Sequence, residues 1–417
     1  MSALLSLAPT VRAAVMLAVI ALLALVVPSW LPIALALVLL GALLADGWMV
    51  RRAPTIQRSA RSVLSRGASV PLRVTAHTAD GRRVLLRQAP AAGIGVDGGT
   101  GISELDGAMT GVRRGRHLLP GVASASLGPL GLARVHHGAG ETSELRVYPD
   151  VVGARRLILR LRRSMAGQPS GMARGPLGLG TEFEAIRDYS VDDDIRAINW
   201  RATARLGRPM SNQYRVDRDR EVVCLIDCGR LMGASLGSGT VLDAALDAVT
   251  VIGLAVDELG DRFGAIAFDD DVRRTLTPRH LGGSDVVERL FDLESRPVDS
   301  DFERAFARIG RSRRALVFVH TDLVDEFAAR SLLAGVAALV RRHAVIVATA
   351  SDPELVAVAA ANGDPGMRLV ALDVLAARHE ATVRLRHAGA QVLEAPASRL
   401  PERCLQAYVT AKRRVLL

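Results

Sequence analysis

The 417-residue sequence is short of cysteine and of aromatic side chains, and each shortage narrows the class of protein. Three cysteines cannot form a disulfide framework in a chain of this length, and they favour a reducing compartment. Aromatic residues make up only 4 %, but hydrophobic residues reach 49 %, so the chain has enough aliphatic material for several cores. This composition excludes a disordered protein, and the length predicts two or three domains of roughly 150 residues each.

Lysine is also scarce: Lys412 is the only one, although lysine and arginine together number 53 and the net charge is +10. The arginines are spread along the chain and interleaved with acidic residues, whereas a nucleic-acid surface requires a basic patch or stripe. We therefore attribute the basic excess to the base composition of the genome and expect no nucleic-acid partner.

Several common catalytic signatures are missing too. The sequence has no Gly-x-x-x-x-Gly-Lys, no His-Glu-x-x-His and no paired Cys-x-x-Cys, and we expect no Gly-x-Ser-x-Gly nucleophile elbow. Cys224 and Cys228 fall on an expected strand and the loop after it, so we interpret them as ordinary small thiols. The sequence therefore predicts a protein that is not an enzyme.

No charge interrupts the stretch between Arg12 and Asp46. As a single helix it would reach roughly 50 Å, against a hydrocarbon core of about 30 Å. The sequence Pro28-Ser29-Trp30-Leu31-Pro32 lies in its middle and predicts a tight turn. We therefore expect residues 1–52 to hold a hairpin of two transmembrane helices, near residues 10–28 and 32–50.

Arginines flank this hairpin on both sides, at Arg12, Arg51 and Arg52, and the turn carries none. By the positive-inside rule both ends lie in the cytoplasm. We therefore expect a multi-pass plasma-membrane protein, with the lipid bilayer as a partner and cytoplasmic soluble domains. A cleaved signal peptide is the alternative, but a second apolar segment follows where a cleavage site would be required.

The remaining chain divides into a β-rich part and an α/β part. In residues 53–150, short strands separated by turn signals predict a small β-sandwich-like domain. In residues 221–417, apolar strands alternate with helices, which predicts a doubly wound α/β domain with ligand sites at the strands' carboxyl ends. The aspartates at those expected ends are Asp227, Asp269, Asp270, Asp271, Asp322 and Asp352.

Residues 151–220 read as a linker followed by a motif dense in charged and aromatic residues. The motif has about as many basic as acidic side chains, which favours internal ion pairs over a polyanion site. We expect it to join the linker to the α/β domain or to form a second contact surface. Its candidate interaction residues are Glu182, Phe183, Arg187, Tyr189, Asp193, Asp194, Arg196, Trp200 and Arg205.

This motif resembles that of the bacterial domain-of-unknown-function 58 family. The family hallmark is Glu-Phe, then Arg-x-Tyr, then Gly-Asp-Asp-x-Arg-x-Ile-Asp-Trp, then Ala-Arg. The sequence departs from it twice: Asp192 stands where the family has glycine, and Asn199 stands where it has aspartate. The matching positions are Glu182-Phe183, Arg187-Asp188-Tyr189, Asp193-Asp194, Arg196, Ile198, Trp200 and Ala204-Arg205, with further similarity at Arg114-Gly115-Arg116, Gly128–Leu132 and Val147–Pro149.

The resemblance implies a membrane hairpin, a β-rich domain and a von Willebrand factor A-like domain. It also implies association with a MoxR-type ATPase and a chaperone-like or metal-insertion role toward client proteins.

Von Willebrand factor A-like domains often bind Mg²⁺ through Asp-x-Ser-x-Ser, a threonine and a later aspartate. Asp227 and Asp322 fit the two aspartates and Thr240 loosely fits the threonine, but both serines are missing. Fewer oxygen ligands and the nearby Arg230 weaken Mg²⁺ binding. We therefore expect a degenerate site, where Asp227 caps the next turn or pairs with Arg230, and keep bound Mg²⁺ as the alternative.

Three hypotheses for function follow. The first is a membrane-tethered, non-enzymatic scaffold or chaperone-like accessory protein that acts with a MoxR-type ATPase. The alternative is a metal-dependent hydrolase using Asp227, Asp270 and Asp322, although no nucleophile or base stands at matched spacing. A third, an outward-facing envelope assembly factor, conflicts with the arginine flanks.

Overall fold

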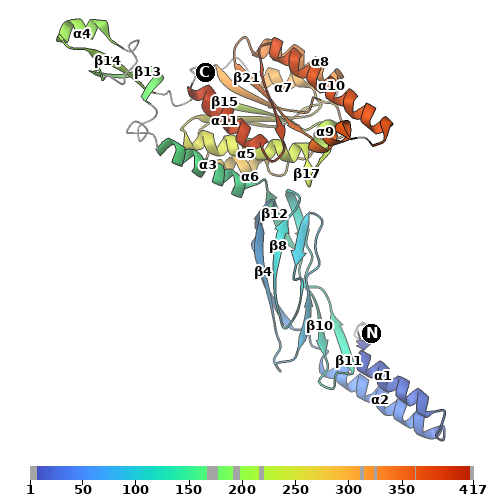
Figure 1. Ribbon diagram of the computed structural model, residues 1–417. Helices are drawn as coiled ribbons and strands as arrows, with labels where there is room; N and C mark the ends of the chain where they lie inside the picture. The colour runs from blue at the N-terminus through green and yellow to red at the C-terminus, as the bar shows by residue number, and fades with distance from the viewer. Residues whose placement is uncertain are drawn as a thin grey trace. The chain divides into compact units, whose positions relative to one another are not determined.

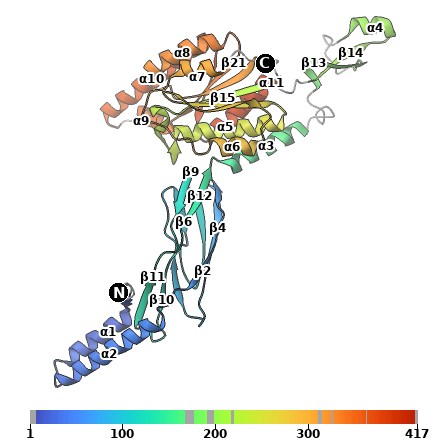
Figure 2. The same ribbon diagram turned by 180° about the vertical axis from the view of Figure 1, so that it is seen from behind.

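The computed structural model describes residues 7–166, 177–190, 198–215, 220–309, 314–323, 326–361 and 363–413. The chain divides into two compact units, one ending at Tyr148 and the other beginning at Pro149. The candidate residues Asp193, Asp194 and Arg196, and the departure at Asp192, lie outside the described residues. The two units are described separately below (Figures 1 and 2).

The first unit begins with two apolar helices, α1 (Val11–Leu23) and α2 (Trp30–Met49). By length and composition α2 can cross a membrane, whereas α1 has 13 residues, fewer than the about 20 that a span needs. The turn lies earlier than expected, because Pro32 is in the first turn of α2, where its missing N–H costs no hydrogen bond. Most large side chains of both helices are exposed.

Strands of the first unit form a nine-stranded sheet and a three-stranded sheet. Leu72 and Val74 of the larger sheet and Leu145 and Val147 of the smaller one belong to the same hydrophobic core, so the two sheets pack on each other. The larger sheet has the order β1 (Leu7–Pro9), β11 (Ala133–His137), β10 (Ala123–Leu127), β5 (Val84–Arg87), β7 (Thr100–Ile102), β8 (Glu104–Gly111), β4 (Ser69–His77), β2 (Thr55–Ser59), with β6 (Ile94–Asp97) beside β8. The smaller has the order β3 (Val63–Ser65), β12 (Ser143–Tyr148), β9 (Gly115–Leu119).

Asp46, near the end of α2, anchors the helix pair to the larger sheet. Its fully buried carboxylate accepts hydrogen bonds from the backbone N–H groups of Leu130, Leu132 and Ala133, each at 2.8 Å. Gly128 is required beside it, since a Cβ atom there would lie 2.2 Å from the carboxylate. A charged residue thus ends the apolar stretch because the 128–133 loop supplies the donors that its burial demands.

The second unit is built on a six-stranded sheet with helices on both faces (Figure 1). Its order is β19 (Val272–Arg279), β18 (Arg262–Phe268), β15 (Glu221–Asp227), β20 (Ala315–His320), β21 (Ala344–Ser351), β22 (Gln391–Pro396). In chain order this is 3-2-1-4-5-6, the doubly wound arrangement, with β19 the antiparallel edge strand. Alternate residues of β15 enter the two cores: Val222, Cys224 and Ile226 one, Val223 and Leu225 the other.

Side chains of α3, α5, α6 and α11 fill the first of these cores, and those of α7, α8 and α10 fill the second. The helices are α3 (Val151–Ala166), α5 (Val241–Glu258), α6 (Gly283–Leu290), α7 (Phe302–Ile309), α8 (Glu326–Leu339), α9 (Pro353–Ala360), α10 (Pro365–His387) and α11 (Leu400–Arg413). A 3-10 turn (Arg230–Gly233) and the short strands β16 (Ser235–Leu236) and β17 (Gly239–Thr240) precede α5.

Helix α3 corrects one expectation, since residues from 151 on were interpreted as a linker. Its many arginines indicated a solvent-exposed segment, but Ala154 and Ile158 lie on one side of the helix and join the core beside α5. On the exposed side, Arg162 pairs with Glu258 of α5. The arginines therefore cover a helix that is packed on its other face.

The family motif forms a hairpin of two strands with a short helix between them. Strands β13 (Leu177–Asp188) and β14 (Met210–Arg215) pair antiparallel, and α4 (Trp200–Leu206) precedes β14. Asn199 caps α4 by accepting from Ala202 N at 2.9 Å.

Candidate functional site

Polar side chains gather where the central strands β15 and β20 end. Asp227 is the last residue of β15, and Thr321 and Asp322 directly follow β20. Each of the three is at most 4 % exposed. The doubly wound order places this edge where such sheets bind ligands, so this carboxyl edge, defined by Asp227, Ser300, Thr321, Asp322 and Arg378, is the first candidate site.

Both oxygens of Asp227 are already engaged within the protein. Oδ1 accepts from Gly229 N at 2.8 Å and from the hydroxyl of Ser300, and Oδ2 accepts from the hydroxyl of Thr321 at 2.6 Å. Burial raises the pKa of Asp227, and these three hydrogen bonds only partly oppose the rise. Asp227 therefore caps the turn, as expected, but Arg230 pairs instead with Asp299 at 2.6 Å.

Asp322 is neutralised by an arginine from a distant helix. Arg378 of α10 places Nη2 2.8 Å from Asp322 Oδ1, and the two side chains are 9 % and 3 % exposed. Leu323 N donates to the same oxygen at 2.8 Å. Burial raises the pKa of Asp322, while the charge of Arg378 acts in the opposite direction.

This donor set does not fit a hard divalent cation. Mg²⁺ requires several oxygen ligands with free lone pairs, whereas the guanidinium of Arg378 already occupies one side of Asp322. Thr240 is not available as a metal ligand either, because its hydroxyl caps α5 by accepting from Asp243 N at 3.2 Å. Throughout the described ranges no three His, Cys, Asp or Glu side chains form a group that could hold a metal.

The aspartates of the hydrolase hypothesis do not converge. Asp270 is exposed, whereas Asp227 and Asp322 are buried, and the three form no metal-holding group. Asp269 is fully buried, and its carboxylate faces Arg273 and Arg296 at 3.5 and 3.8 Å. Arginines of the protein itself therefore neutralise Asp269 and Asp322, whereas Asp227 is bonded to hydroxyl and backbone N–H groups.

One catalytic pattern in the sequence was missed: Gly233-Ala234-Ser235-Leu236-Gly237 matches the Gly-x-Ser-x-Gly of hydrolase nucleophile elbows. An elbow requires a sharp turn from a strand directly into a helix. Ser235 instead lies exposed in the two-residue strand β16, opposite Thr240. The geometry therefore does not support a nucleophile at Ser235.

The described residues of the family motif lie in the hairpin formed by β13, α4 and β14. Trp200 is 69 % exposed, and Arg205 is also exposed. Glu182 and Phe183 stand opposite Arg215 and Tyr214 in the register of β13 and β14. Arg187 is the last residue but one of β13 and donates to the carbonyl of Asp188 at 3.1 Å, and the N–H of Tyr189 donates to Pro209 O at 3.0 Å.

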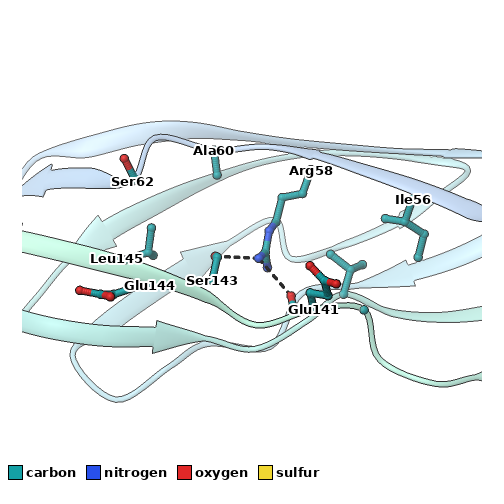
Figure 3. A pocket seen from close by; sticks show the side chains of 10 residues that line it. Ile56, Arg58, Ala60, Ser62, Glu141, Ser143, Glu144 and Leu145 are labelled. Carbon is teal, nitrogen blue, oxygen red and sulfur yellow. Dashed lines mark hydrogen bonds between the residues drawn. The ribbon is translucent and has the colours of Figure 1, made fainter.

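The first unit has a hollow of about 430 Å³ between its strands (Figure 3). Arg58 points into it and donates to Ser143 Oγ at 2.7 Å and to Gln88 Oε1 at 3.1 Å, besides the carbonyls of Pro120 and Glu141. Burial lowers the pKa of Arg58. Because its donors are spent on these neighbours, Arg58 acts as a cross-link between strands and loops.

Sequence reasoning found Asp227 and Asp322 but missed Ser300, Thr321 and Arg378. Arg378 carried a usable signal, because Ala371, Arg378, Ala381 and Leu385 recur at helical spacing and are all buried. An arginine on such a face predicts a buried acidic partner.

The fold and this edge define the chain as a protein with an apolar helix pair, a β-rich unit and a doubly wound α/β unit. The family described as "Protein of unknown function DUF58" matches residues 185–385 of the chain, which agrees with the resemblance of its motif.

Two kinds of relatives are similar to parts of the chain. Uncharacterized proteins of Mycobacterium bovis and Mycobacterium tuberculosis are 28 % identical over 198 residues, which cover 45 % of this chain. The match spans 59 % of the length of those relatives. A solved structure described as an uncharacterized membrane spanning protein from Vibrio fischeri aligns with 46 % of this chain and 97 % of its own, at 13 % identity and a TM-score of 0.16, too low to support a conclusion.

Proposed function

We propose that this protein is a membrane-tethered, non-enzymatic scaffold or chaperone-like accessory protein that acts with a MoxR-type ATPase on client proteins. In this proposal α1 and α2 form a hairpin in the plasma membrane, and both soluble units are cytoplasmic. The second unit is a von Willebrand factor A-like domain. Its 3-2-1-4-5-6 strand order with an antiparallel third strand supports that assignment.

The observation that carries the proposal is the closed carboxyl edge. Asp227 and Asp322 are buried and already bonded to Ser300, Thr321 and Arg378. A hydrolase needs groups that are free to contact substrate, and an unpaired nucleophile with its base. An edge whose carboxylates are already bonded within the protein suits a rigid platform for protein contacts.

The exposed side chains of the two helices support the tether. Val15, Leu22, Ile33 and Val38 are each at least half exposed, although each is apolar. A soluble protein rarely leaves so continuous an apolar surface in water, whereas lipid covers it without cost. Arg12 and Arg51 flank the pair at the end from which the rest of the chain continues.

The exposed hairpin of the family motif is the proposed contact surface for the ATPase. Trp200 and Leu206 are 69 % and 53 % exposed, and Arg201 and Arg205 lie on the same short helix. Tryptophan and arginine dominate the binding energy of protein interfaces, which makes α4 the part of the chain best suited to hold a partner.

Membrane topology can be tested with introduced cysteines. The three native cysteines are all buried, so they give little background labelling in the folded protein. Single variants Ser29→Cys, Ser59→Cys and Ala361→Cys report on the helix turn and on the two units. We expect a membrane-impermeant thiol reagent added to intact cells to label only Ser29→Cys, and labelling of Ala361→Cys would contradict the cytoplasmic orientation.

The partner can be tested by co-purification of the full chain in detergent with a MoxR-type ATPase from the same cells. We expect Trp200→Ala to reduce recovery of the ATPase at least tenfold, as loss of a central aromatic anchor does. Leu369→Ala is the matched control, because Leu369 is 70 % exposed on α10. Equal recovery with Trp200→Ala and Leu369→Ala would exclude α4 as the contact.

A further inference from the structure

The first unit has a second hollow, of about 660 Å³, at the foot of the helix pair. Strands β10 and β11 lie beside this foot in both views (Figures 1 and 2). Four arginines line the hollow: Arg12, Arg82, Arg83 and Arg134. We refer to these four residues and the loop around Gly131 as the arginine hollow.

Three of the four arginines lack a counter-charge. Arg82 pairs with Asp80 at 2.6 Å and donates to Met49 O at 3.0 Å. Arg12, Arg83 and Arg134 have no carboxylate within ion-pair distance among the described residues of the chain. The nearby Asp46 does not neutralise them, because its oxygens accept from backbone N–H groups.

Two details show that the hollow is prepared for an anion. Arg134 Nε is buried and has no hydrogen-bond partner, which leaves a donor that water does not satisfy. Gly131 has φ +70°, and a Cβ atom there would lie 3.1 Å from a terminal nitrogen of Arg12, so the loop conformation lets Arg12 lie against its backbone. Three guanidinium groups that line one hollow without a paired carboxylate match a phosphate, which accepts paired hydrogen bonds.

The position of the hollow points to the source of that phosphate. Arg12 directly precedes the uncharged stretch of α1, and Arg51 stacks over Trp48 at the end of α2 with 4.5 Å from the guanidinium to the ring. Arginine and tryptophan at helix ends mark the level of lipid headgroups. The arginine hollow thus opens where the apolar helices meet the polar strands.

We propose that the arginine hollow binds the phosphate of an anionic phospholipid, with Arg12, Arg83 and Arg134 as its ligands. The inference rests on the placement of α1 and α2 in the bilayer proposed above. It adds a lipid-selective contact to a tether that would otherwise accept any bilayer, and so ties the orientation of the first unit to the lipid composition of the leaflet.

The test is native mass spectrometry of the full chain in detergent, titrated with phosphatidylglycerol or with phosphatidylcholine. Each arginine near anionic lipid contributes about 1 kcal/mol, so the triple variant R12Q/R83Q/R134Q should bind phosphatidylglycerol about 100-fold more weakly. The single variant Arg83→Gln, at an exposed residue that folding does not need, should lose about fivefold. Phosphatidylcholine should bind more weakly to the unaltered chain.

The matched control is R61Q/R87Q/R113Q, which removes the same charge from exposed arginines of the first unit outside the hollow. Equal losses in the two triple variants would overturn the proposal, because binding would then follow net charge alone. A second arm adds inorganic phosphate to the lipid-bound chain. Displacement of phosphatidylglycerol by millimolar phosphate would assign the hollow to a soluble phosphate and overturn the lipid source, whereas retention supports it. Insertion into nanodiscs by all variants separates a failure of this site from a failure of the tether.

Discussion

The arginine hollow of the first unit and the carboxyl edge of the second both gather charged side chains, but they differ in whether those charges have partners within the protein. At the carboxyl edge every charge has a partner inside the protein, as Arg378 has in Asp322. At the hollow, Arg12, Arg83 and Arg134 have none within the described chain. A compensated group stabilises the fold, whereas an uncompensated one is available to a ligand, so charge balance separates structural from binding clusters more reliably than charge density.

Two buried carboxylates extend the comparison. Asp46 is satisfied by backbone donors of one local loop, and Asp322 by an arginine 56 residues further along the chain. The first arrangement depends on the conformation of a loop, and the second on the docking of helix α10. Their removal should therefore have consequences of different size and extent.

The largest effect is expected from Arg378→Met, which leaves Asp322 buried without its cation. Removing one partner of a buried ion pair typically costs about 3–5 kcal/mol of the free energy of unfolding. Urea unfolding of the α/β unit can be followed in the full chain through the accessibility of its three buried thiols. The penalty should shrink as the pH falls, because a protonated Asp322 no longer needs the arginine.

The control for this prediction is Arg384→Met on the same helix. Arg384 pairs with Glu380 at the surface, with 49 % and 61 % of the side chains exposed, and such pairs contribute about 0.5 kcal/mol or less. The double variant R378M/D322N should recover most of the loss. A cost for Arg378→Met as small as that for Arg384→Met would show that the edge is not closed by this pair.

Asp46→Ala should have a smaller and more local effect. It leaves three backbone N–H groups without their acceptor, at about 1 kcal/mol each once water reaches the loop. Because of this loss, we expect the amides of Leu130, Leu132 and Ala133 to exchange with deuterium faster, by roughly one to two orders of magnitude. Protection of strands β4 and β8 should not change, and loss of protection there would mean that Asp46 supports the whole sheet.

His320 provides a pH-dependent test of an uncompensated group inside the second unit. Its ring is fully buried, neither nitrogen has a hydrogen-bond partner, and burial lowers its pKa to about 3 from 6.5. Between these two pKa values, the His320 ring is therefore neutral in the folded state and protonated in the unfolded state. The stability due to neutral His320 is complete above pH 6.5 and is lost as the pH falls toward 3, by about 2 kcal/mol at pH 5.

The variant His320→Leu should remove this part of the acid sensitivity. The raised pKa values of Asp227 and Asp322 act in the opposite direction. A carboxyl group whose pKa is higher in the folded state than in the unfolded state adds stability as the pH falls. They are present in both proteins, so the difference between the two pH profiles isolates His320. Exposed His387→Leu is the control, and parallel profiles for the two variants would contradict the assignment.

Much of the second unit could be predicted because its signals are local. Apolar runs such as residues 222–226 are buried on both faces of a parallel sheet, and Asp227 and Asp322 follow strands whose ends the sequence marks. The contacts that decide the chemistry are not local. Nothing near Asp322 indicates that Arg378 will reach it, because that pairing is fixed only when α10 docks on the sheet.

Segments rich in arginine were the hardest to interpret. In α3, charged side chains concealed the helical spacing of Ala154 and Ile158, so a packed helix was taken for a linker. In the first unit, Arg83 directly precedes β5 and Arg134 lies in β11, and only the pairing of β10 with both strands brings them into one sheet beside the foot of α1. The sequence shows charges in order along the chain, whereas a binding cluster depends on which of them the fold leaves unpaired.

The smallest expected effect concerns Asn199, where the family has aspartate. Its Oδ1 caps α4, as a carboxylate also would, but its Nδ2 donates to Asn212 Oδ1 at 2.7 Å, which a carboxylate cannot do. In Asn199→Asp the cap remains and the amide of Asn212 can rotate to donate to the new carboxylate, so we expect a change of about 0.5 kcal/mol or less. Asn199→Ala removes both bonds and should cost about 1 kcal/mol more, seen as faster deuterium exchange at Ala202 and Thr203. If Asn199→Asp destabilised α4 as much as Asn199→Ala does, the family's aspartate would require a partner that this chain has replaced, and Asn212 would be the position at which to restore it.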